Sequence, residues 1–503
     1  MNVAMLLDMA ADGFGDRIVV GRTAEELTPA RLRELAAGGA RVVRAAGADA
    51  IVYLAVNGPA FPIALFAAAQ AGVPLVPVNY RLGAEQLDAL LANHPRALGI
   101  ADPEQAEALR RAGLSVRSPE EWIASAADAG VDDGAEVPAA PETPAVLIYT
   151  SGTTSAPKGV VLRHHNLVSY VLGTVEFAGA DADEAALMSV PPYHIAAVSN
   201  VLTNLYAGRR VLTLEQFTPQ QWLELVREQR ITNAMVVPTM LARIMDGDGL
   251  DRSVPSLRSL AYGGAKMPVR VIETALREWP HVDFVNAYGL TETSSTISVL
   301  GPEEHRAAVA SDDPAVRARI GSAGRPVPGI ELEVRAESGA LAAAGEPGQI
   351  WVRGEQVSGE YAGHRASVDE RGFFHTRDHG RVDADGYLYI EGRVDDTIIR
   401  GAENIAPAEI EDVLLRHPDV LDAVVVGVLD EEWGQRIEAV VVPRSGVDVD
   451  AEQLRAEVRK TLRGSKTPDR ITYWPELPRT ATGKLVRRDI VAALTADRQP
   501  TAG

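Results

Sequence analysis

The chain has 503 residues, of which 46% are hydrophobic, so it is long enough for two to four domains or subdomains with buried cores. Acidic residues outnumber basic ones by 69 to 49, and the resulting net charge of −20 disfavours binding to nucleic acid or anionic membrane surfaces. Because the chain contains no cysteine, disulfides, thiolate nucleophiles, zinc–thiolate sites and iron–sulfur clusters are excluded.

The N-terminus and the longest apolar run bear on localisation. The first residues include acids and lack the basic region of a signal peptide. The longest apolar run, residues 64–78, is too short and too interrupted to span a bilayer. We therefore expect a soluble, cytoplasmic protein without a transmembrane segment.

Helical and strand-like patterns alternate through the first 330 residues. One example is the helical pattern at 61–72 ("FPIALFAAAQAG"), followed by the strand-like "VPLVPV" at 73–78. This alternation predicts an α/β architecture with largely parallel sheets. Residues 119–144 are acidic and rich in alanine and proline, and we expect them to form a surface connection before the buried strand "AVLIYT" at 145–150.

A hydroxyl-rich loop with the sequence "YTSGTTSAPKGV" follows at 149–160. Small residues let a backbone come close to a ligand, hydroxyl and N–H groups donate hydrogen bonds, and a lysine adds charge, so the loop suits phosphate. It is not a P-loop, because Pro157 and Gly159 stand where that motif requires glycine and serine or threonine. Composition alone also allows a solvated surface turn.

The pattern changes after residue 330. Short strand patterns separated by turns, such as "DADG" at 383–386, predict a β-rich subdomain up to residue 390. Beyond it, alternating helix and strand patterns predict a compact α+β unit. We expect an α/β protein with a large N-terminal domain (1–394) of layered α/β subdomains plus the β-rich subdomain, and a small, mobile C-terminal α+β domain (395–503).

Further motifs accompany the loop in chain order. They are "AYGLTETSS" at 287–295, "FHTRDHGRVDADGYLYIEGRVDDTIIRGAENIAPAEIE" at 374–411 and "PRTATGKLVRRDI" at 478–490. With them the chain resembles the adenylate-forming superfamily of acyl-CoA synthetases, peptide-synthetase adenylation domains and luciferases, closest to fatty-acid or aryl-acid CoA ligases. The resemblance implies that a carboxylic acid and MgATP give an acyl adenylate and pyrophosphate, after which coenzyme A displaces AMP.

The resemblance also implies where the phosphates and the metal bind. Glu292 matches the magnesium ligand, with Thr150 as a further metal contact, and Thr291 matches an α-phosphate donor. A hard cation prefers carboxylate and phosphate oxygens, and charge gathers on the phosphoryl oxygens in the transition state. The residues matched to the β- and γ-phosphates are Thr150, Ser151, Gly152, Thr153, Thr154 and Lys158.

The nucleoside and acid sites are implied in the same way. Asp378 matches the acid that accepts hydrogen bonds from both ribose hydroxyls, and Arg393 would reach the ribose or the phosphates. Arg377 stands where the family usually has glycine. Tyr288 would cover one face of the adenine, although core packing also explains a buried tyrosine. Other residues matched to the nucleotide pocket are Gly263, Gly264, Ala265, Asn286, Ala287 and Gly289.

Further matches concern the acid, the catalytic lysine and the acceptor. His194 matches the gate beside the acid site, for which core packing is again the alternative, and the glycines at 263–264 are expected to leave space for a long or flat acyl group. Lys484 matches the lysine that bridges the carboxylate and the α-phosphate, and Asp395 matches the hinge. Gly401 and Ala402 match the pantetheine tunnel, where the family usually has two glycines, so Ala402 adds a methyl group.

Three readings of the function follow from the resemblance. The first is an acid–thiol ligase that uses ATP, Mg²⁺ and coenzyme A. The second passes the activated acyl group to a carrier-protein thiol, an amine or another nucleophile. The third is a non-catalytic binding protein on the same fold. The sequence leaves open the identity of the acid, the acceptor, the pathway and the oligomeric state.

Overall fold

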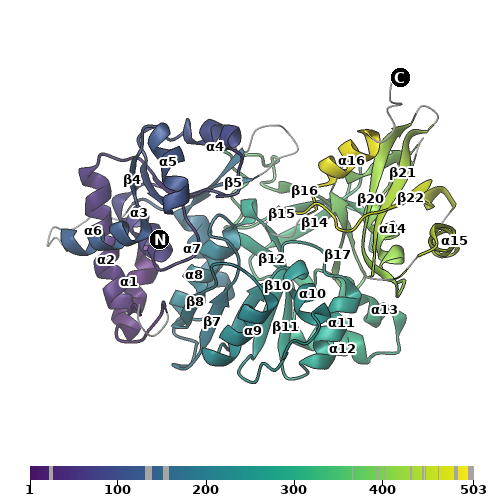
Figure 1. Cartoon of the computed structure of the whole chain (residues 1–503), viewed down its shortest axis with the longest axis horizontal. Helices are drawn as coiled ribbons and strands as arrows, with labels where there is room; N and C mark the ends of the chain where they lie inside the picture. The colour runs from purple at the N-terminus through teal and green to yellow at the C-terminus, as the bar shows by residue number, and fades with distance from the viewer. Residues whose placement is uncertain are drawn as a thin grey trace.

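The computed structural model describes residues 1–21, 26–130, 139–150, 158–364, 366–393, 396–400, 403–430, 433–444, 447, 449–462, 464–480 and 485–496. Figure 1 shows a large N-terminal part with two α/β sheets and, at the other end of the molecule, a smaller part built on β20, β21 and β22. Among the described residues, none of the helices combines the length and the apolar character that crossing a bilayer requires.

The first sheet has the strand order β4-β3-β1-β2-β5-β6. The pairs from β4 to β5 are parallel, and only β6 runs antiparallel to its neighbour. Its strands are β1 (Ile51–Leu54), β2 (Leu75–Pro77), β3 (Leu98–Ala101), β4 (Ser115–Arg117), β5 (Pro144–Thr150) and β6 (Lys158–Arg163). The helices of this region are α1 (Val3–Phe14), α2 (Pro29–Ala45), α3 (Ala60–Ala71), α4 (Ala84–Leu91), α5 (Pro103–Arg111), α6 (Pro119–Ala129) and α7 (His164–Thr174).

The second sheet has the order β13-β12-β11-β10-β9-β7-β8. The five strands from β11 to β8 are parallel, which confirms the predicted α/β class, and β12 and β13 extend the sheet antiparallel. The strands are β7 (Ala185–Met188), β8 (Arg210–Thr213), β9 (Asn233–Val236), β10 (Ser259–Gly263), β11 (Asp283–Leu290), β12 (Ser295–Leu300) and β13 (Arg325–Pro326). The helical segments are α8 (Ile195–Ala207), α9 (Pro219–Glu228), α10 (Pro238–Asp246), α11 (Val269–Glu278), η1 (Thr291–Thr293), α12 (Pro302–Ala310), α13 (Pro314–Ala318) and η2 (Arg319–Gly321).

One continuous hydrophobic core joins the two sheets. Helix α3 is the clearest part of it, since every residue from Ala60 to Ala69 is buried. A helix that is apolar on all sides belongs in the interior. The helix ends at Gly72, whose φ of 75° gives the left-handed conformation that favours glycine at a helix C-terminus. Contacts between α1, α7 and α8 pack the two α/β units together.

The expectation for residues 119–144 is wrong over its first part, because 119–129 form helix α6. Ser118 and Glu121 make a reciprocal capping box, in which each side chain accepts a hydrogen bond from the other residue's amide, at 3.2 and 2.9 Å. The helix then buries Trp122 completely. The acidic residues Glu120 and Glu121 lie on the exposed face of the helix, whereas Ala126 is buried together with Trp122. Residues 131–138 lie outside the described part.

Four antiparallel strands in the order β14-β15-β16-β17 form the predicted β-rich subdomain. Between β16 and β17, the Gly386 amide donates to the Asp383 carbonyl at 3.0 Å, and the φ of 85° at Gly386 explains the glycine. The predicted hairpin turn is thus confirmed. The strands are β14 (Glu331–Arg335), β15 (Gly348–Arg353), β16 (Phe374–Val382) and β17 (Leu388–Arg393).

The C-terminal part has hydrophobic clusters of its own, on both sides of the sheet formed by β20, β21 and β22. Helix α14 also contacts β17 of the N-terminal part. The proposed boundary at 394–395 lies outside the described residues. The elements are β18 (Ile398–Arg400), β19 (Glu403–Ile405), α14 (Pro407–Leu414), β20 (Val420–Asp430), β21 (Gly434–Pro443), α15 (Ala451–Thr461), η4 (Gly464–Lys466), β22 (Arg470–Tyr473) and α16 (Arg487–Ala496).

We predict that Trp122→Ala lowers the free energy of unfolding of the N-terminal part by about 3–5 kcal/mol, because a fully buried indole leaves a cavity. Chemical denaturation followed by circular dichroism measures this change. The matched control is Trp433→Ala, since Trp433 is 45% exposed and its loss should cost less than about 1 kcal/mol. Equal losses in the two variants would contradict the assignment of α6 to the core.

Candidate active site

Most of the described residues of the predicted site lie at two places: where β10 and β11 end, and on the β-rich sheet beside them. Gly263 and Ala287 are direct neighbours on parallel strands. In open α/β sheets, ligands bind beyond the carboxyl ends of the strands. Eight residues singled out from the sequence lie outside the described part, so their roles remain predictions: Ser151, Gly152, Thr153, Thr154, Asp395, Gly401, Ala402 and Lys484.

A tight turn after β11 positions Glu292. The turn contains η1, and the Leu290 amide donates to the Thr293 hydroxyl at 3.0 Å. Ser294 has a φ of 56°, so the chain reverses sharply into β12. A Cβ atom on Gly289 would lie 1.8 Å from the Ser295 carbonyl oxygen, so only glycine fits there. The half-buried Thr291 and Glu292 therefore sit on a backbone whose course is fixed.

The Glu292 carboxylate accepts a hydrogen bond from the Tyr361 hydroxyl at 2.8 Å. Tyr361 lies 69 residues further along the chain and belongs to none of the sequence motifs, so its contact with Glu292 could not be predicted from them. Burial, followed by the neighbouring Glu292 carboxylate, raises the pKa of Tyr361. The phenol therefore keeps its proton and serves as a hydrogen-bond donor.

Asp378 lies at the centre of a second cluster. It is buried, its Oδ2 atom accepts a hydrogen bond from Tyr288 at 2.6 Å, and its Oδ1 atom lies 3.3 Å from the Arg393 guanidinium. Arg393 stands directly opposite Asp378 in the β16–β17 pairing. Burial, followed by the Asp378 charge, raises the pKa of Tyr288, so its hydroxyl also remains a donor. The structure thus brings together three residues that sequence matching placed near the ribose and adenine.

Arg377, which replaces the family's usual glycine, adopts a φ of 63°. This is the left-handed region, where residues other than glycine are uncommon and carry a conformational cost. The backbone beside Asp378 therefore keeps a conformation that suits glycine, although the side chain differs.

The glycines at 263 and 264 do not both provide space for an acyl group, as the sequence suggested. A Cβ atom on Gly263 would lie 2.3 Å from the Ala287 carbonyl oxygen, so this glycine permits strand packing. Gly264 has a φ of 81° and forms the turn after β10. It is exposed, as is Ala265. The expectation of space is therefore wrong for Gly263, where the neighbouring backbone occupies the position.

Other predicted residues have defined surroundings. The Asn286 side chain donates to the Ser322 carbonyl at 2.8 Å, which ties β11 to the loop before β13. His194 is half-buried at the N-terminus of α8. Thr150 pairs with Lys158 across β5 and β6, so the described ends of the predicted phosphate loop lie side by side.

The described residues suit magnesium held jointly with a nucleotide. Among them, no group of three or more histidines or acids could form a metal cage. Magnesium is commonly bound by one or two carboxylates, substrate phosphates and water. A carboxylate, as on Glu292, and a hydroxyl oxygen, as on Thr150, are donor types that fit Mg²⁺ bound to ATP.

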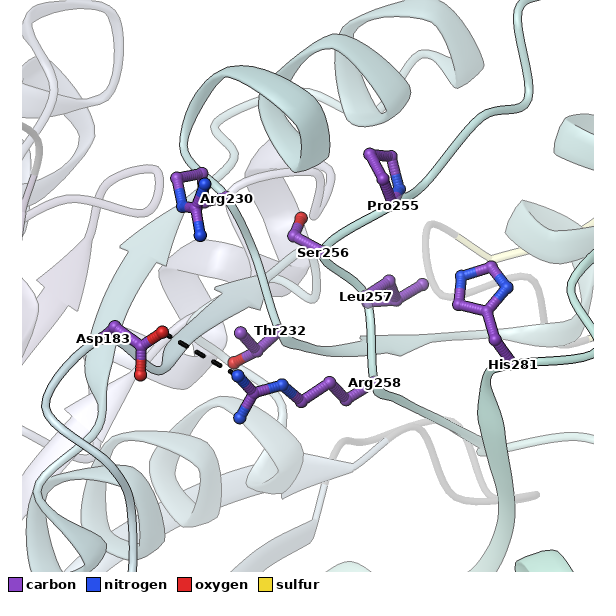
Figure 2. A pocket seen from close by; sticks show the side chains of 8 residues that line it. All are labelled: Asp183, Arg230, Thr232, Pro255, Ser256, Leu257, Arg258 and His281. Atoms are coloured by element: carbon purple, nitrogen blue, oxygen red, sulfur yellow. Dashed lines mark ion pairs between the residues drawn. The ribbon is translucent and has the colours of Figure 1, made fainter.

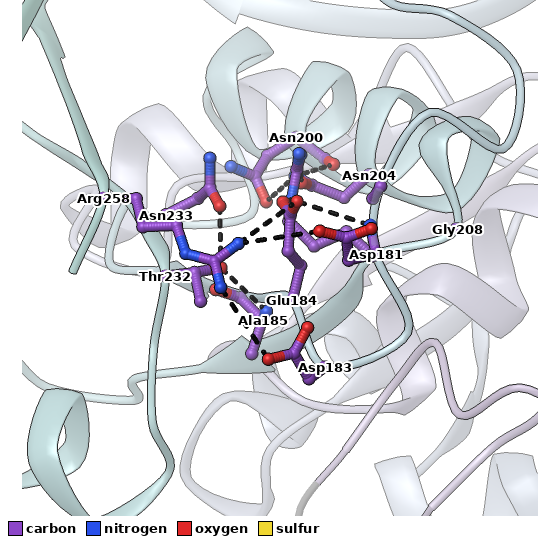
Figure 3. Close-up of polar contacts among 12 residues, drawn as sticks. Asp181, Asp183, Glu184, Ala185, Asn200, Asn204, Gly208, Thr232, Asn233 and Arg258 are labelled. Carbon is purple, nitrogen blue, oxygen red and sulfur yellow. Dashed lines mark hydrogen bonds and ion pairs between the residues drawn. The ribbon is translucent and has the colours of Figure 1, made fainter. Parts of the chain in front are cut away.

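A cavity of about 220 Å³ opens at the opposite end of the second sheet. Figure 2 shows its lining, including Arg258, which precedes β10, and Asp183, which precedes β7. In Figure 3 the Arg258 guanidinium lies among the carboxylates of Asp181, Asp183 and Glu184, at 3.8–3.9 Å. Such long ion pairs of an exposed arginine contribute little energy. This cavity lies at the strand starts, away from the residues matched to the nucleotide.

Comparison with known proteins identifies the family. The sequence matches the profile described as "AMP-binding enzyme" over residues 7–362 and the profile described as "AMP-binding enzyme C-terminal domain" over residues 409–484. A feruloyl-CoA synthase from Amycolatopsis sp is 36% identical over 474 residues, covering 92% of this chain and 93% of the relative. A "Fatty acid--[acyl-carrier-protein] ligase ScoC" from Streptomyces coeruleorubidus is 32% identical and covers 90% and 88%.

Solved structures agree with this assignment. The amide bond synthetase McbA from Marinactinospora thermotolerans has a TM-score of 0.86 at 28% identity and covers 98% of this chain and 99% of its own. The chain belongs to the AMP-binding enzyme family, the adenylate-forming ligases, which confirms the resemblance and the fold class. It is a ligase, and the family uses ATP, Mg²⁺ and coenzyme A.

We predict that Arg377→Val lowers the free energy of unfolding by about 1–2 kcal/mol, because a β-branched residue tolerates positive φ poorly. Arg377→Gly is the matched control, with an expected loss below about 0.5 kcal/mol, since relief of strain offsets the greater entropy of the unfolded chain. Chemical denaturation measures both variants. If both variants were destabilised equally, the side chain and not the backbone conformation would be what matters at this position.

Proposed function

We propose that the chain is an AMP-forming acid–thiol ligase that converts an aromatic carboxylic acid into its coenzyme A thioester. The observation that carries this proposal is the cluster of Tyr288, Asp378 and Arg393 beside β11, with Glu292 in the turn that follows that strand, in a member of this family. Relatives named feruloyl-CoA synthase, indoleacetate–CoA ligase and 2-succinylbenzoate–CoA ligase support an aromatic acid.

In the first half-reaction, a carboxylate oxygen of the acid attacks the α-phosphorus of ATP. The new O–P bond forms as the bond to the β-phosphate oxygen breaks, and pyrophosphate leaves. Asp378 would accept hydrogen bonds from the ribose hydroxyls, and Lys484 would balance the charges of the carboxylate and the α-phosphate. Glu292 would hold the magnesium ion, which neutralises the phosphate charge.

In the second half-reaction, a thiol sulfur attacks the carbonyl carbon of the acyl adenylate, and AMP leaves with the former carboxylate oxygen. We propose that residues 395–503 rotate on Asp395 between the two steps and bring Gly401 and Ala402 to the thiol. The separate clusters of buried residues in the C-terminal part support a unit that can move as a body.

A second acceptor class has specific support. One relative is named for an acyl-carrier protein, and one similar structure is an amide bond synthetase. Ala402 adds a methyl group at the position matched to the pantetheine tunnel. Transfer to a carrier-protein thiol or an amine is therefore the second candidate, with the same first half-reaction.

The function is tested by pyrophosphate release over a panel of carboxylic acids, with and without coenzyme A. We expect release with aryl acids such as ferulate and indoleacetate, and thioester formation only when coenzyme A is present. Straight-chain fatty acids are the comparison set. Activity with fatty acids alone would reject the aromatic assignment, and acyl-AMP that does not react with coenzyme A would favour the second acceptor class.

We predict that Lys484→Ala lowers adenylate formation by at least about 100-fold and leaves thioester formation from supplied acyl-AMP within about threefold of the wild type, because the lysine contacts the reacting charges only in the first step. Single-turnover measurements of each step separate the two effects. Lys466→Ala is a control, since that lysine of the same domain pairs with Glu409. Equal losses in both steps would contradict the two-conformation mechanism.

A further inference from the structure

Residues 358–362, which we call the strap, run along the strand that leaves the predicted phosphate loop. The Ala362 amide donates to the Gly159 carbonyl at 2.7 Å, and the Val161 amide donates to the Glu360 carbonyl at 3.0 Å. These bonds pair the strap with β6, which on its other edge pairs with β5. The strap is therefore hydrogen-bonded to the strand on which Lys158 lies.

A charged contact fixes the centre of the strap. The Arg163 guanidinium donates two hydrogen bonds to the Glu360 carboxylate, each of 2.8 Å. Both side chains are largely buried, with 29% and 23% exposure. A bidentate pair of this kind restricts geometry more than a single contact does. Tyr361, the next residue, therefore starts from a fixed backbone.

The other side of the strap holds Glu292 at two points. The amides of Ser358 and Gly359 donate to its backbone carbonyl, at 2.8 and 3.3 Å. The Tyr361 hydroxyl donates to its Oε1 atom at 2.8 Å. In the described part of the chain, no other side chain is hydrogen-bonded to this carboxylate. Because the bond uses Oε1, Oε2 can bind a cation without breaking it.

Tyr361 also faces the predicted phosphate loop. The Lys158 ammonium lies 6.0 Å from the centre of the Tyr361 ring, within the range of a cation–π contact. One residue thus contacts both the acid matched to the metal and the lysine matched to the phosphates.

We propose that Tyr361 is a positioning residue that couples magnesium binding at Glu292 to phosphate binding at Lys158. The inference rests on the proposed function, because the roles of Glu292 and Lys158 are themselves proposals. A glutamate already held in one rotamer loses less conformational entropy when it binds the ion. Without the Tyr361 hydroxyl, the Glu292 side chain is free to change rotamer and loses this conformational entropy only when the ion binds. Magnesium should then strengthen nucleotide binding less.

The test is a binding measurement with no catalytic turnover. Isothermal titration calorimetry follows α,β-methylene-ATP binding with and without Mg²⁺, and the ratio of the two affinities gives the magnesium enhancement. For Tyr361→Phe we expect this enhancement to fall at least fivefold, with the affinity in the absence of Mg²⁺ within about twofold of the wild type. Loss of affinity in both conditions would indicate a merely structural role and overturn the proposal.

Two further variants complete the test. Tyr389→Phe removes another tyrosine–carboxylate hydrogen bond, to Asp383 at 3.3 Å, and should leave the enhancement unchanged. Glu292→Gln is expected to remove the magnesium enhancement completely. Adding Tyr361→Phe to Glu292→Gln should then lower the enhancement no further. If Glu292→Gln loses the enhancement while Tyr361→Phe keeps it, this inference is wrong and the proposed metal site stands. If Glu292→Gln also keeps the enhancement, the proposed metal site itself is wrong.

Discussion

The close packing of backbone at the end of β11 is the constraint on which the rest of the site depends. Gly263 lies against the Ala287 carbonyl, and Gly289 lies against the Ser295 carbonyl, so neither position has room for a Cβ atom. These two contacts fix β11 between β10 and β12. Tyr288 can then reach Asp378, and Glu292 can reach Tyr361. A side chain at either glycine would force the strands apart and move both clusters.

The electrostatic demands of the proposed reaction are met locally. A chain with a net charge of −20 repels ATP at long range, so the phosphates require nearby cations. Lys158 on β6 and Arg393 on β17 would supply such charge under the proposed function. The two acids of the predicted site each have a defined partner. Asp378 lies against Arg393 and Tyr288, and Glu292 is hydrogen-bonded to Tyr361. Local pairing thus offsets an unfavourable overall charge.

The contact between the two parts of the chain includes a weak interaction, which suits the proposed rotation. Lys266, in the turn after β10, pairs with Asp412 of α14 at 2.6 Å, and both side chains are 41% exposed. Exposed ion pairs contribute about 0–1 kcal/mol, so this one is easily exchanged for water. Inside the C-terminal part, by contrast, Arg487 pairs with Glu411 at 2.8 Å, with both side chains largely buried. The proposed rotation would have to break the exposed Lys266–Asp412 pair, whereas the Arg487–Glu411 pair lies inside the proposed moving unit.

The sequence by itself determined the family, the α/β class and the β-rich subdomain, because motifs and hydrophobic periodicity are local properties of the chain. The left-handed backbone at Arg377, where the family usually has glycine, was decided by the structure. Tertiary structure decided the rest. Whether Gly263 leaves room for a ligand depends on the adjacent strand, and the burial of Trp122 depends on the core. Tyr361 was invisible to motif analysis because its contact with Glu292 joins residues that are distant in sequence, and only the folded sheet brings them together.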